Sequence, residues 1–224
     1  MSETSTGPEF GADEIEIWLR RAAALIEDNA SELTRLDGEI GDADHGANMQ
    51  RGMRGVTALL DEDGPAAGGS LTTLDALLKK VGMTLVSTVG GASGPLYGTF
   101  FLRMAGALKD RSTADAAALA EALRAGVGGI EQRGKSTTGE KTMLDAWVPA
   151  VDAFAEADTS DLGAALKAGA TAAAEGRDAT RDMVATKGRA SYLGERSAGH
   201  IDPGAASTAL LWRAATEAAE GAQS

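Results

Sequence analysis

Apolar residues recur every three to four positions along most of this chain, which is the spacing of one face of an α-helix. Ile15, Trp18, Ala22 and Leu25 form the first such face. Glycine, proline and aspartate interrupt the pattern and divide it into eight segments, whereas no pair of strands is indicated. The expected helices span 11–35, 45–61, 70–90, 93–110, 113–133, 140–157, 160–187 and 203–220.

Successive long helices with short connections predict an all-α fold, an up-and-down antiparallel bundle of eight helices. The length of 224 residues fits one domain, which we place at residues 11–224. Residues 1–10 are expected to form a flexible lead-in, because they are mostly polar and precede the first periodic segment.

Four of the connections, 36–48, 90–98, 133–142 and 187–207, are rich in glycine and in polar or charged residues. They follow the first, third, fifth and seventh expected helices. In an up-and-down bundle, connections after odd-numbered helices all emerge at the same end. The pattern therefore predicts that four segments far apart in sequence meet at one rim, while the connections at the other end act as spacers.

Composition narrows the classes of protein that this bundle can belong to. The net charge of −12 argues against nucleic acid and against an anionic membrane surface as partners. The chain has no cysteine and only two histidines, which excludes disulfides, thiolate metal sites and a multi-histidine zinc site. No apolar run reaches the length of a membrane span, and the first residues do not resemble a secretory signal. A cytoplasmic protein is expected.

The first polar connection carries Asp37, Asp42 and Asp44 within eight positions. Carboxylates this close repel one another unless a cation lies between them, and hard cations such as Mg2+ prefer oxygen ligands. Helix capping and aspartate turns are the alternative explanation of acidic residues beside glycine. A calcium EF-hand does not fit, because the twelfth position counted from Asp37 is Asn48 instead of glutamate. His45 is left open as a base, a metal ligand or a donor to phosphate.

The other three connections carry weaker signals. The glycine-rich segment around Ser93 suits a phosphate or a helix cap, but it lacks the Gly-Lys-Ser/Thr end of a Walker A loop. Residues 133–143 offer hydroxyls and cations, which fit a solvated loop equally well, and helical spacing favours a core position for Met143. The fourth connection is longer than a bundle needs. It contains Arg189, a candidate to neutralise phosphate, and Asp202 before a further helix start.

Six motifs in these connections resemble those of the nucleotide-binding L subunits of the dihydroxyacetone kinases. The motifs are Leu36-Asp37-Gly38, Gly41-Asp42-Ala43-Asp44-His45-Gly46-x-Asn48-Met49, Gly91-Ala92-Ser93-Gly94-Pro95-Leu96-Tyr97-Gly98, Gly139-x-Lys141-Thr142-Met143-Leu144-Asp145, Gly188-Arg189-Ala190-Ser191-Tyr192-Leu193-Gly194-Glu195-Arg196 and His200-x-Asp202-Pro203-Gly204-Ala205. The resemblance extends from about residue 12 to residue 220, and no position that the pattern needs departs from it.

The resemblance implies an eight-helix antiparallel barrel that holds ADP or ATP and two Mg2+ ions at one end. By resemblance, Asp37, Asp42 and Asp44 are the metal ligands, and they form the catalytic set together with Arg189. The nucleotide contacts implied in the same way are His45, Gly46, Ala47, Asn48, Ala92, Ser93, Gly134, Met143, Arg189, Asp202, Pro203 and Gly204.

In this family the L subunit works with partners. A separate K subunit holds dihydroxyacetone covalently on a histidine, and an M subunit of the phosphotransferase system rephosphorylates ADP in place. The short, separate form of this chain favours that regime over direct use of ATP. No general base is required on this chain, so we expect no kinase activity without a partner. A transcriptional regulator and a second copy of the chain are further partners that the resemblance leaves open.

Three alternatives stay open from the sequence. The acceptor could be another small ketose such as erythrulose, which only the K-like partner would decide. The subunit could instead use exchangeable ATP directly. The third alternative is a relative that binds nucleotide without catalysis and regulates a transcription factor. The three aspartates argue against such an inactive site.

Overall fold

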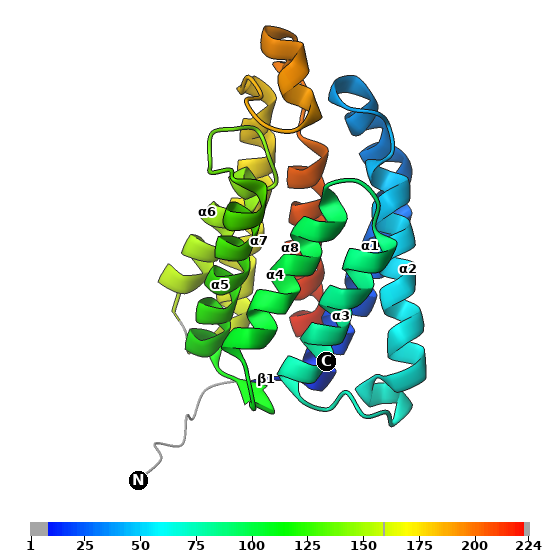
Figure 1. The fold of residues 1–224 in the computed structure, drawn as a ribbon. Helices are drawn as coiled ribbons and strands as arrows, with labels where there is room; N and C mark the ends of the chain where they lie inside the picture. The colour runs from blue at the N-terminus through cyan, green and yellow to red at the C-terminus, as the bar shows by residue number, and fades with distance from the viewer. Residues whose placement is uncertain (1–8, 159, 222–224) are drawn as a thin grey trace.

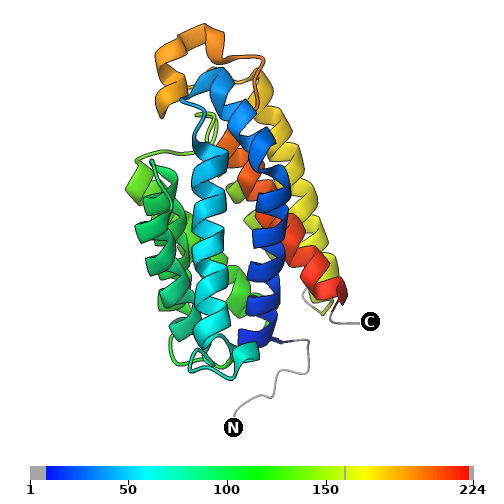
Figure 2. The ribbon, with the colours of Figure 1, turned by 90° about the vertical axis from the view of Figure 1, so that its right-hand side faces the viewer.

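Eight α-helices form an antiparallel barrel in the computed structural model, which describes residues 9–158 and 160–221 (Figures 1 and 2). They are α1 Ala12–Ile40, α2 His45–Asp63, α3 Leu74–Thr88, α4 Ser93–Ala107, α5 Ala116–Gly134, α6 Leu144–Glu156, α7 Leu162–Ala179 and α8 Pro203–Gly221. Each helix packs against the next in the chain, and α8 packs against α1 to close the ring. The predicted all-α class is confirmed.

Aromatic side chains fill part of the interior between the helices. The rings of Phe100 and Trp147 lie 4.1 Å apart, and Trp147 lies 6.0 Å from Trp212, so that α4, α6 and α8 are joined across the barrel. Small residues let the backbones of neighbouring helices approach closely. A Cβ on Gly82 of α3 would meet the carbonyl oxygen of Gly98 in α4 at 2.9 Å. Burial of the apolar face of each helix therefore stabilises the barrel.

Two short strands lie at the lower end of the barrel in Figure 1. β1 Phe10–Gly11 pairs antiparallel with β2 Thr113–Ala114. The expectation of no strand pair is wrong here, because two residues are too few to show an alternating pattern. Phe10 is also 4% exposed and packs in the core, so the expected lead-in does not include it. Residues 1–8 of that lead-in lie outside the described residues.

Two helix ends differ from the sequence prediction. α1 continues to Ile40 instead of residue 35, because Leu36 and Ile40 extend its buried face. Asp37 therefore lies in the last turn of the helix. α7 ends at Ala179 instead of residue 187, where the hydroxyl of Thr180 donates to the carbonyl of Arg177 at 2.6 Å.

Short 3-10 turns occupy parts of the connections. They are η1 Pro65–Ala67, η2 Thr180–Asp182 and η3 Arg189–Ser197. η3, orange in Figures 1 and 2, projects above the upper end of the barrel. The fourth connection is thus partly ordered as turns.

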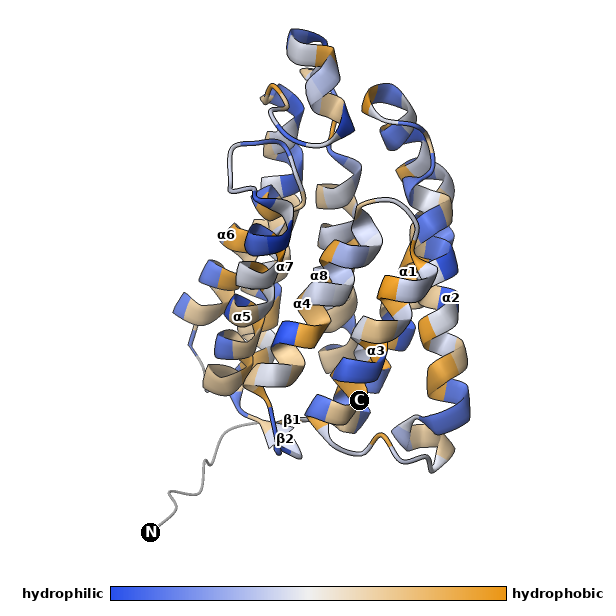
Figure 3. Cartoon of the chain, in the orientation of Figure 1, coloured by the Kyte–Doolittle hydropathy of each residue, from blue (hydrophilic) through white to orange (hydrophobic). Residues whose placement is uncertain are grey.

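The connections after α1, α3, α5 and α7 all lie toward the upper end of the barrel, as the alternation of helix directions predicts (Figure 1). This end is largely hydrophilic in Figure 3. Within the described residues, no helix is both long enough and apolar enough to cross a membrane. The fold therefore gathers the polar segments at a single rim.

Candidate functional site

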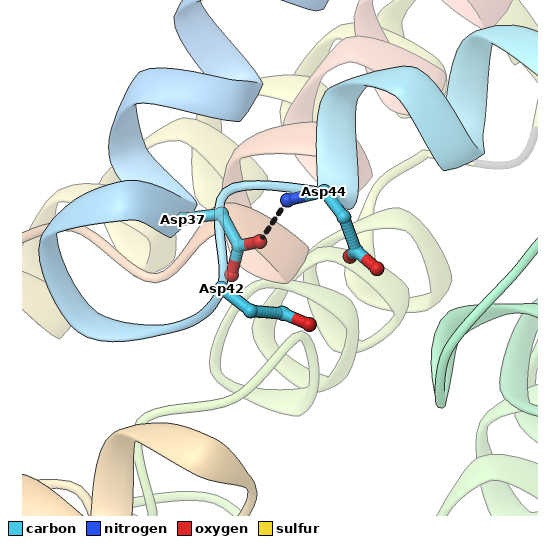
Figure 4. A group of neighbouring side chains, drawn as sticks. All are labelled: Asp37, Asp42 and Asp44. Atoms are coloured by element: carbon cyan, nitrogen blue, oxygen red, sulfur yellow. Dashed lines mark hydrogen bonds between the residues drawn. The ribbon is translucent and has the colours of Figure 1, made fainter.

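Three carboxylates meet in the tight turn between α1 and α2 (Figure 4). Asp37, Asp42 and Asp44 each offer an oxygen atom, and these atoms all lie within 4.8 Å of one another. A Cβ at position 41 would lie 2.1 Å from Oδ1 of Asp37, so the turn requires Gly41. Ala43 adopts a left-handed backbone with φ of 60°. The oxygen-only donor set fits a hard divalent cation.

Asp37 combines a capping role with its place in this cluster. It is 8% exposed, and its Oδ2 accepts the backbone N–H groups of Asp44 at 2.8 Å and His45 at 3.1 Å. It therefore caps the first turn of α2. Asp42 is exposed and forms an ion pair of 2.9 Å with Nη2 of Arg189. The cluster thus already attracts a cationic side chain from the fourth connection.

His45 lies buried at the start of α2, between two other helices. Its Nε2 lies 2.9 Å from the hydroxyl of Ser207 in α8, and its Nδ1 lies 3.2 Å from the hydroxyl of Ser93 in α4. Burial lowers the pKa of His45 to about 4, against the opposing effect of Asp37 and Asp44. A neutral ring with both nitrogens beside hydroxyls joins α2, α4 and α8, and this arrangement favours neither a base nor a metal ligand.

The N-terminus of α8 faces the acidic turn across the rim. Asp202 caps this helix, because its Oδ2 accepts the N–H of Ala205 at 2.7 Å. Burial raises the pKa of Asp202 to about 7; the Ala205 N–H and Lys141 oppose this shift, and the carboxylates of Asp145 and Asp37 add to it. Pro203 has no N–H, and Asp202 accepts the N–H groups of Ala205 and Ala206, which leaves the N–H of Gly204 as the donor suited to phosphate at this helix end.

Tyr97 of α4 makes hydrogen bonds to the first turns of α8. Its hydroxyl lies 2.8 Å from that of Ser207 and 3.0 Å from that of Thr208, and it donates to the carbonyl of Gly204 at 3.2 Å. Burial raises the pKa of Tyr97 to about 12. These contacts hold α4 and α8 together beneath the rim.

The third connection is held by Asp145 at the start of α6. Its carboxylate accepts the N–H of Thr142 at 2.7 Å and that of Gly139. Lys141 is buried below this loop, and its ammonium donates to the carbonyls of Thr180 and His200. Burial lowers the pKa of Lys141, and the nearby Asp202 opposes this shift.

One open cleft joins all these segments. Among the sequence-predicted residues, its lining includes the three aspartates together with His45, Asn48, Ala92, Ser93, Met143, Arg189, Asp202, Pro203 and Gly204. Gly134 lines an adjoining cleft that shares Leu96 and Met143 with the first. The structure therefore brings most of the predicted residues together.

Two predicted contacts, Gly46 and Ala47, are not among the residues that line either cleft. A Cβ on Gly46 would meet the carbonyl of Ala30 at 1.9 Å, so this glycine permits close packing of α2 on α1. Ala47 is exposed on the first turn of α2. The local structure explains Gly46 by helix packing.

Lys141, Lys187 and Leu96 line the main cleft but were not predicted as site residues. Lys141 and Leu96 stand inside the motifs Gly139-x-Lys141-Thr142 and Gly94-Pro95-Leu96. These motifs were the sequence signal that could have assigned both residues to the site. Lys187 lies 4.0 Å from Glu140 and links the third connection to the fourth. Only the folded chain shows that contact.

Comparison with known proteins gives consistent likenesses. The sequence model of the DAK2 domain matches residues 39–217. The ADP-binding subunit DhaL of the PEP-dependent dihydroxyacetone kinase 1 of Listeria innocua is 48% identical over 88% of this chain and 91% of that protein. The DhaL subunit of Escherichia coli is 44% identical over 87% of this chain and 90% of that protein.

A solved structure shares the fold. The crystal structure of the dihydroxyacetone kinase from C. freundii in complex with AMP-PNP and Mg2+ superimposes with a TM-score of 0.71 at 25% identity. The match covers 97% of this chain and 36% of that chain. Fold, cleft and relatives together define a helical-barrel domain of the dihydroxyacetone kinase type. The chain belongs to the DAK2 domain family, among the DhaL-type subunits. The resemblance read from the sequence motifs is therefore confirmed.

Proposed function

We propose that this chain is the ADP-binding subunit of a phosphoenolpyruvate-dependent dihydroxyacetone kinase, and that it passes phosphate to dihydroxyacetone held on a separate K subunit. The observation that carries the proposal is the meeting of the Asp37, Asp42 and Asp44 cluster with the N-terminus of α8 in one open cleft. Similarity to DhaL subunits over about nine tenths of their length supports it. A cytoplasmic location follows from this function.

The acidic turn is the proposed metal site. Asp37, Asp42 and Asp44 would hold two Mg2+ ions, with Asp37 fixed in place by the N–H groups that it caps. The chemistry that Mg2+ would supply there is neutralisation of the negative charge on phosphate oxygens held beside these carboxylates. Asp37 is preformed for this role, whereas Asp42 would have to exchange its ion pair with Arg189 for the metal ions.

The helix ends are the proposed phosphate site. The N-terminus of α8 at Pro203 and Gly204 and the hydroxyl of Ser93 lie in the same cleft as the carboxylates. Arg189 reaches this cleft from the fourth connection and places a positive charge beside it. These groups stabilise charge on a transferred phosphoryl group by position alone.

The adjoining cleft is the proposed site of the base. Its lining includes Leu96, Ile130 and Met143, which give it apolar walls, and Gly134 at the end of α5. Apolar walls with few polar groups suit a planar base. A nucleotide lying across both clefts would therefore place its phosphates at the carboxylates.

The partners follow from the proposed site, which holds the nucleotide and the metal ions but not the sugar. We place the sugar on a K subunit docked at the open rim, and the donor phosphate on an M subunit of the phosphotransferase system. Reconstitution tests this. The chain together with K-type and M-type subunits should form dihydroxyacetone phosphate from phosphoenolpyruvate, and the chain with ATP and dihydroxyacetone alone should not. Turnover by the purified chain alone would contradict the proposal.

One relative favours a second candidate. The L-erythrulose 1-kinase of Mycolicibacterium smegmatis is 37% identical over 97% of this chain, which spans 37% of that protein. The same site could thus serve erythrulose, or use exchangeable ATP. Native mass spectrometry distinguishes ADP kept as a bound cofactor from direct use of exchangeable ATP. ADP retained in the purified chain supports coupling to the phosphotransferase system. Exchange of the K-type partner identifies the ketose.

A further inference from the structure

Lys141 is a buried cation in the wall of the cleft, and the proposed function does not use it. Lys141 is 1% exposed, and its backbone adopts a left-handed conformation with φ of 61°. Residues other than glycine seldom adopt this conformation, and they persist in it where the surroundings impose it. Here Asp145 imposes it, because its carboxylate holds the N–H groups of Gly139 and Thr142 on either side.

The ammonium group of Lys141 joins two segments that are far apart in sequence. It donates to the carbonyl of Thr180, 39 residues away, and to that of His200, 59 residues away. The same two segments also meet directly, since the N–H of Gly199 donates to the carbonyl of Arg181 at 2.7 Å. Lys141 therefore closes the base of the long fourth connection.

This closure has two consequences at the cleft. The connection carries Arg189 at its outer part, and it ends at Asp202, whose N–H donates to the hydroxyl of Thr180 at 3.0 Å. Thr180 is thus bound by Lys141 through its carbonyl and by Asp202 through its hydroxyl. The position of the α8 N-terminus relative to the third connection depends on this joint.

Lys141 lines the cleft, but its ammonium is engaged by main-chain carbonyls. Its side chain is buried, and two of its three N–H donors are used by main-chain carbonyls. Its positive charge also balances the carboxylates of Asp202, Asp182 and Asp145. Removal of the ammonium would leave the carbonyls of Thr180 and His200 without this donor and would remove a positive charge that acts on Asp202.

We propose that Lys141 is a positioning residue that fixes the N-terminus of α8 and the Arg189 segment against the third connection, so that the cleft is shaped to bind nucleotide. The inference rests on the proposed function. It differs from a general role in stability, because the joint links connections at the rim, whereas the core cluster is formed mainly by apolar residues of the helices.

The test compares Lys141→Met with a matched core variant. Lys141→Met keeps the length of the side chain and removes its charge and donors, whereas Leu77→Ala creates a cavity in α3, where Leu77 is fully buried. Calorimetric titration with ADP in excess Mg2+ is expected to show affinity lowered by about tenfold or more in Lys141→Met. Leu77→Ala should lower the melting temperature at least as much and leave ADP affinity unchanged.

Amide hydrogen exchange supplies a second readout. In Lys141→Met, exchange should rise in residues 180–206 and stay unchanged in α3 and α4. If Lys141→Met does not fold, Lys141→Gln, which keeps a neutral donor, is measured in its place. ADP affinity within twofold of the wild type, or an equal loss in Leu77→Ala, overturns the inference. A wild-type chain that binds no ADP would instead overturn the proposed function.

Discussion

Single residues in this rim carry two tasks at once. Asp37 both caps α2 and offers an oxygen to the acidic cluster, so the capping and metal explanations of its carboxylate are compatible. A carboxylate with two oxygens can accept two N–H groups on one and keep the other for a cation. This division ties the geometry of the cluster to the start of a rigid helix.

Tyr97 gives a prediction about pH at the residue scale. Tyr97→Phe should lower the free energy of unfolding by about 1–2 kcal/mol at neutral pH, because the hydroxyls of Ser207 and Thr208 lose a buried partner. Burial holds the pKa of Tyr97 at about 12, against 10.0 for the free side chain. Between these values the unfolded chain releases a proton that the folded chain keeps, so stability falls as pH rises.

The wild type should therefore lose the contribution of Tyr97 in alkaline solution, while Tyr97→Phe has no such contribution to lose. Urea unfolding should show that the difference between the two proteins shrinks by about 1 kcal/mol from pH 10 to pH 11. Tyr192→Phe is the control, because Tyr192 is 88% exposed. A difference that stays constant with pH would contradict the assignment.

The sequence allowed the carboxylates to be predicted but not the state of His45. Asp37, Asp42 and Asp44 are close in sequence, so their proximity follows from a short turn. The neutrality of His45 depends on burial in the closed barrel, where Ser207, 162 residues away in sequence, meets its ring. Lys141 stands inside a motif visible in the sequence, but its role could not be predicted, since its acceptors come from distant segments.

At the scale of elements, glycines at helix contacts set how closely the helices approach. Gly46→Ala should destabilise the protein by about 2 kcal/mol or more, because its Cβ would meet the carbonyl of Ala30 at 1.9 Å and force α1 and α2 apart. Gly128→Ala in α5 is the matched control. Its Cβ meets nothing within 4 Å, so a gain of about 0.5–1 kcal/mol is expected. Thermal and urea unfolding measure both, and equal stabilities would refute this role of Gly46.

Helix number and type were predictable because the apolar period is local, and all eight expected segments contain α-helices in the described residues. The ends were less predictable. α1 runs to Ile40 because its last turn packs on Ala185 and Ala190 of the fourth connection, a contact that no local pattern shows. The two-residue strands escaped prediction because pairing between 10–11 and 113–114 is entirely long-range.

At the scale of the whole molecule, the alternation of helix directions explains how the site is assembled. Four segments from across the chain meet at one rim, and the opposite end carries the short strands and the described chain ends (Figure 1). This convergence was predictable from the sequence, because connections that follow odd-numbered helices of an up-and-down bundle all emerge at the same end. The cleft itself, with its lining from every one of these segments, required the folded structure.

The central claim is that this rim binds ADP through Mg2+ held by the acidic turn. Calorimetric titration of ADP into the metal-stripped chain, with and without Mg2+, tests it most directly, with Asp44→Asn as the control. The account predicts binding of one ADP by the wild type that depends on Mg2+ and a loss of that binding in Asp44→Asn. Equal ADP affinity with and without Mg2+, or undiminished binding by Asp44→Asn, would contradict it.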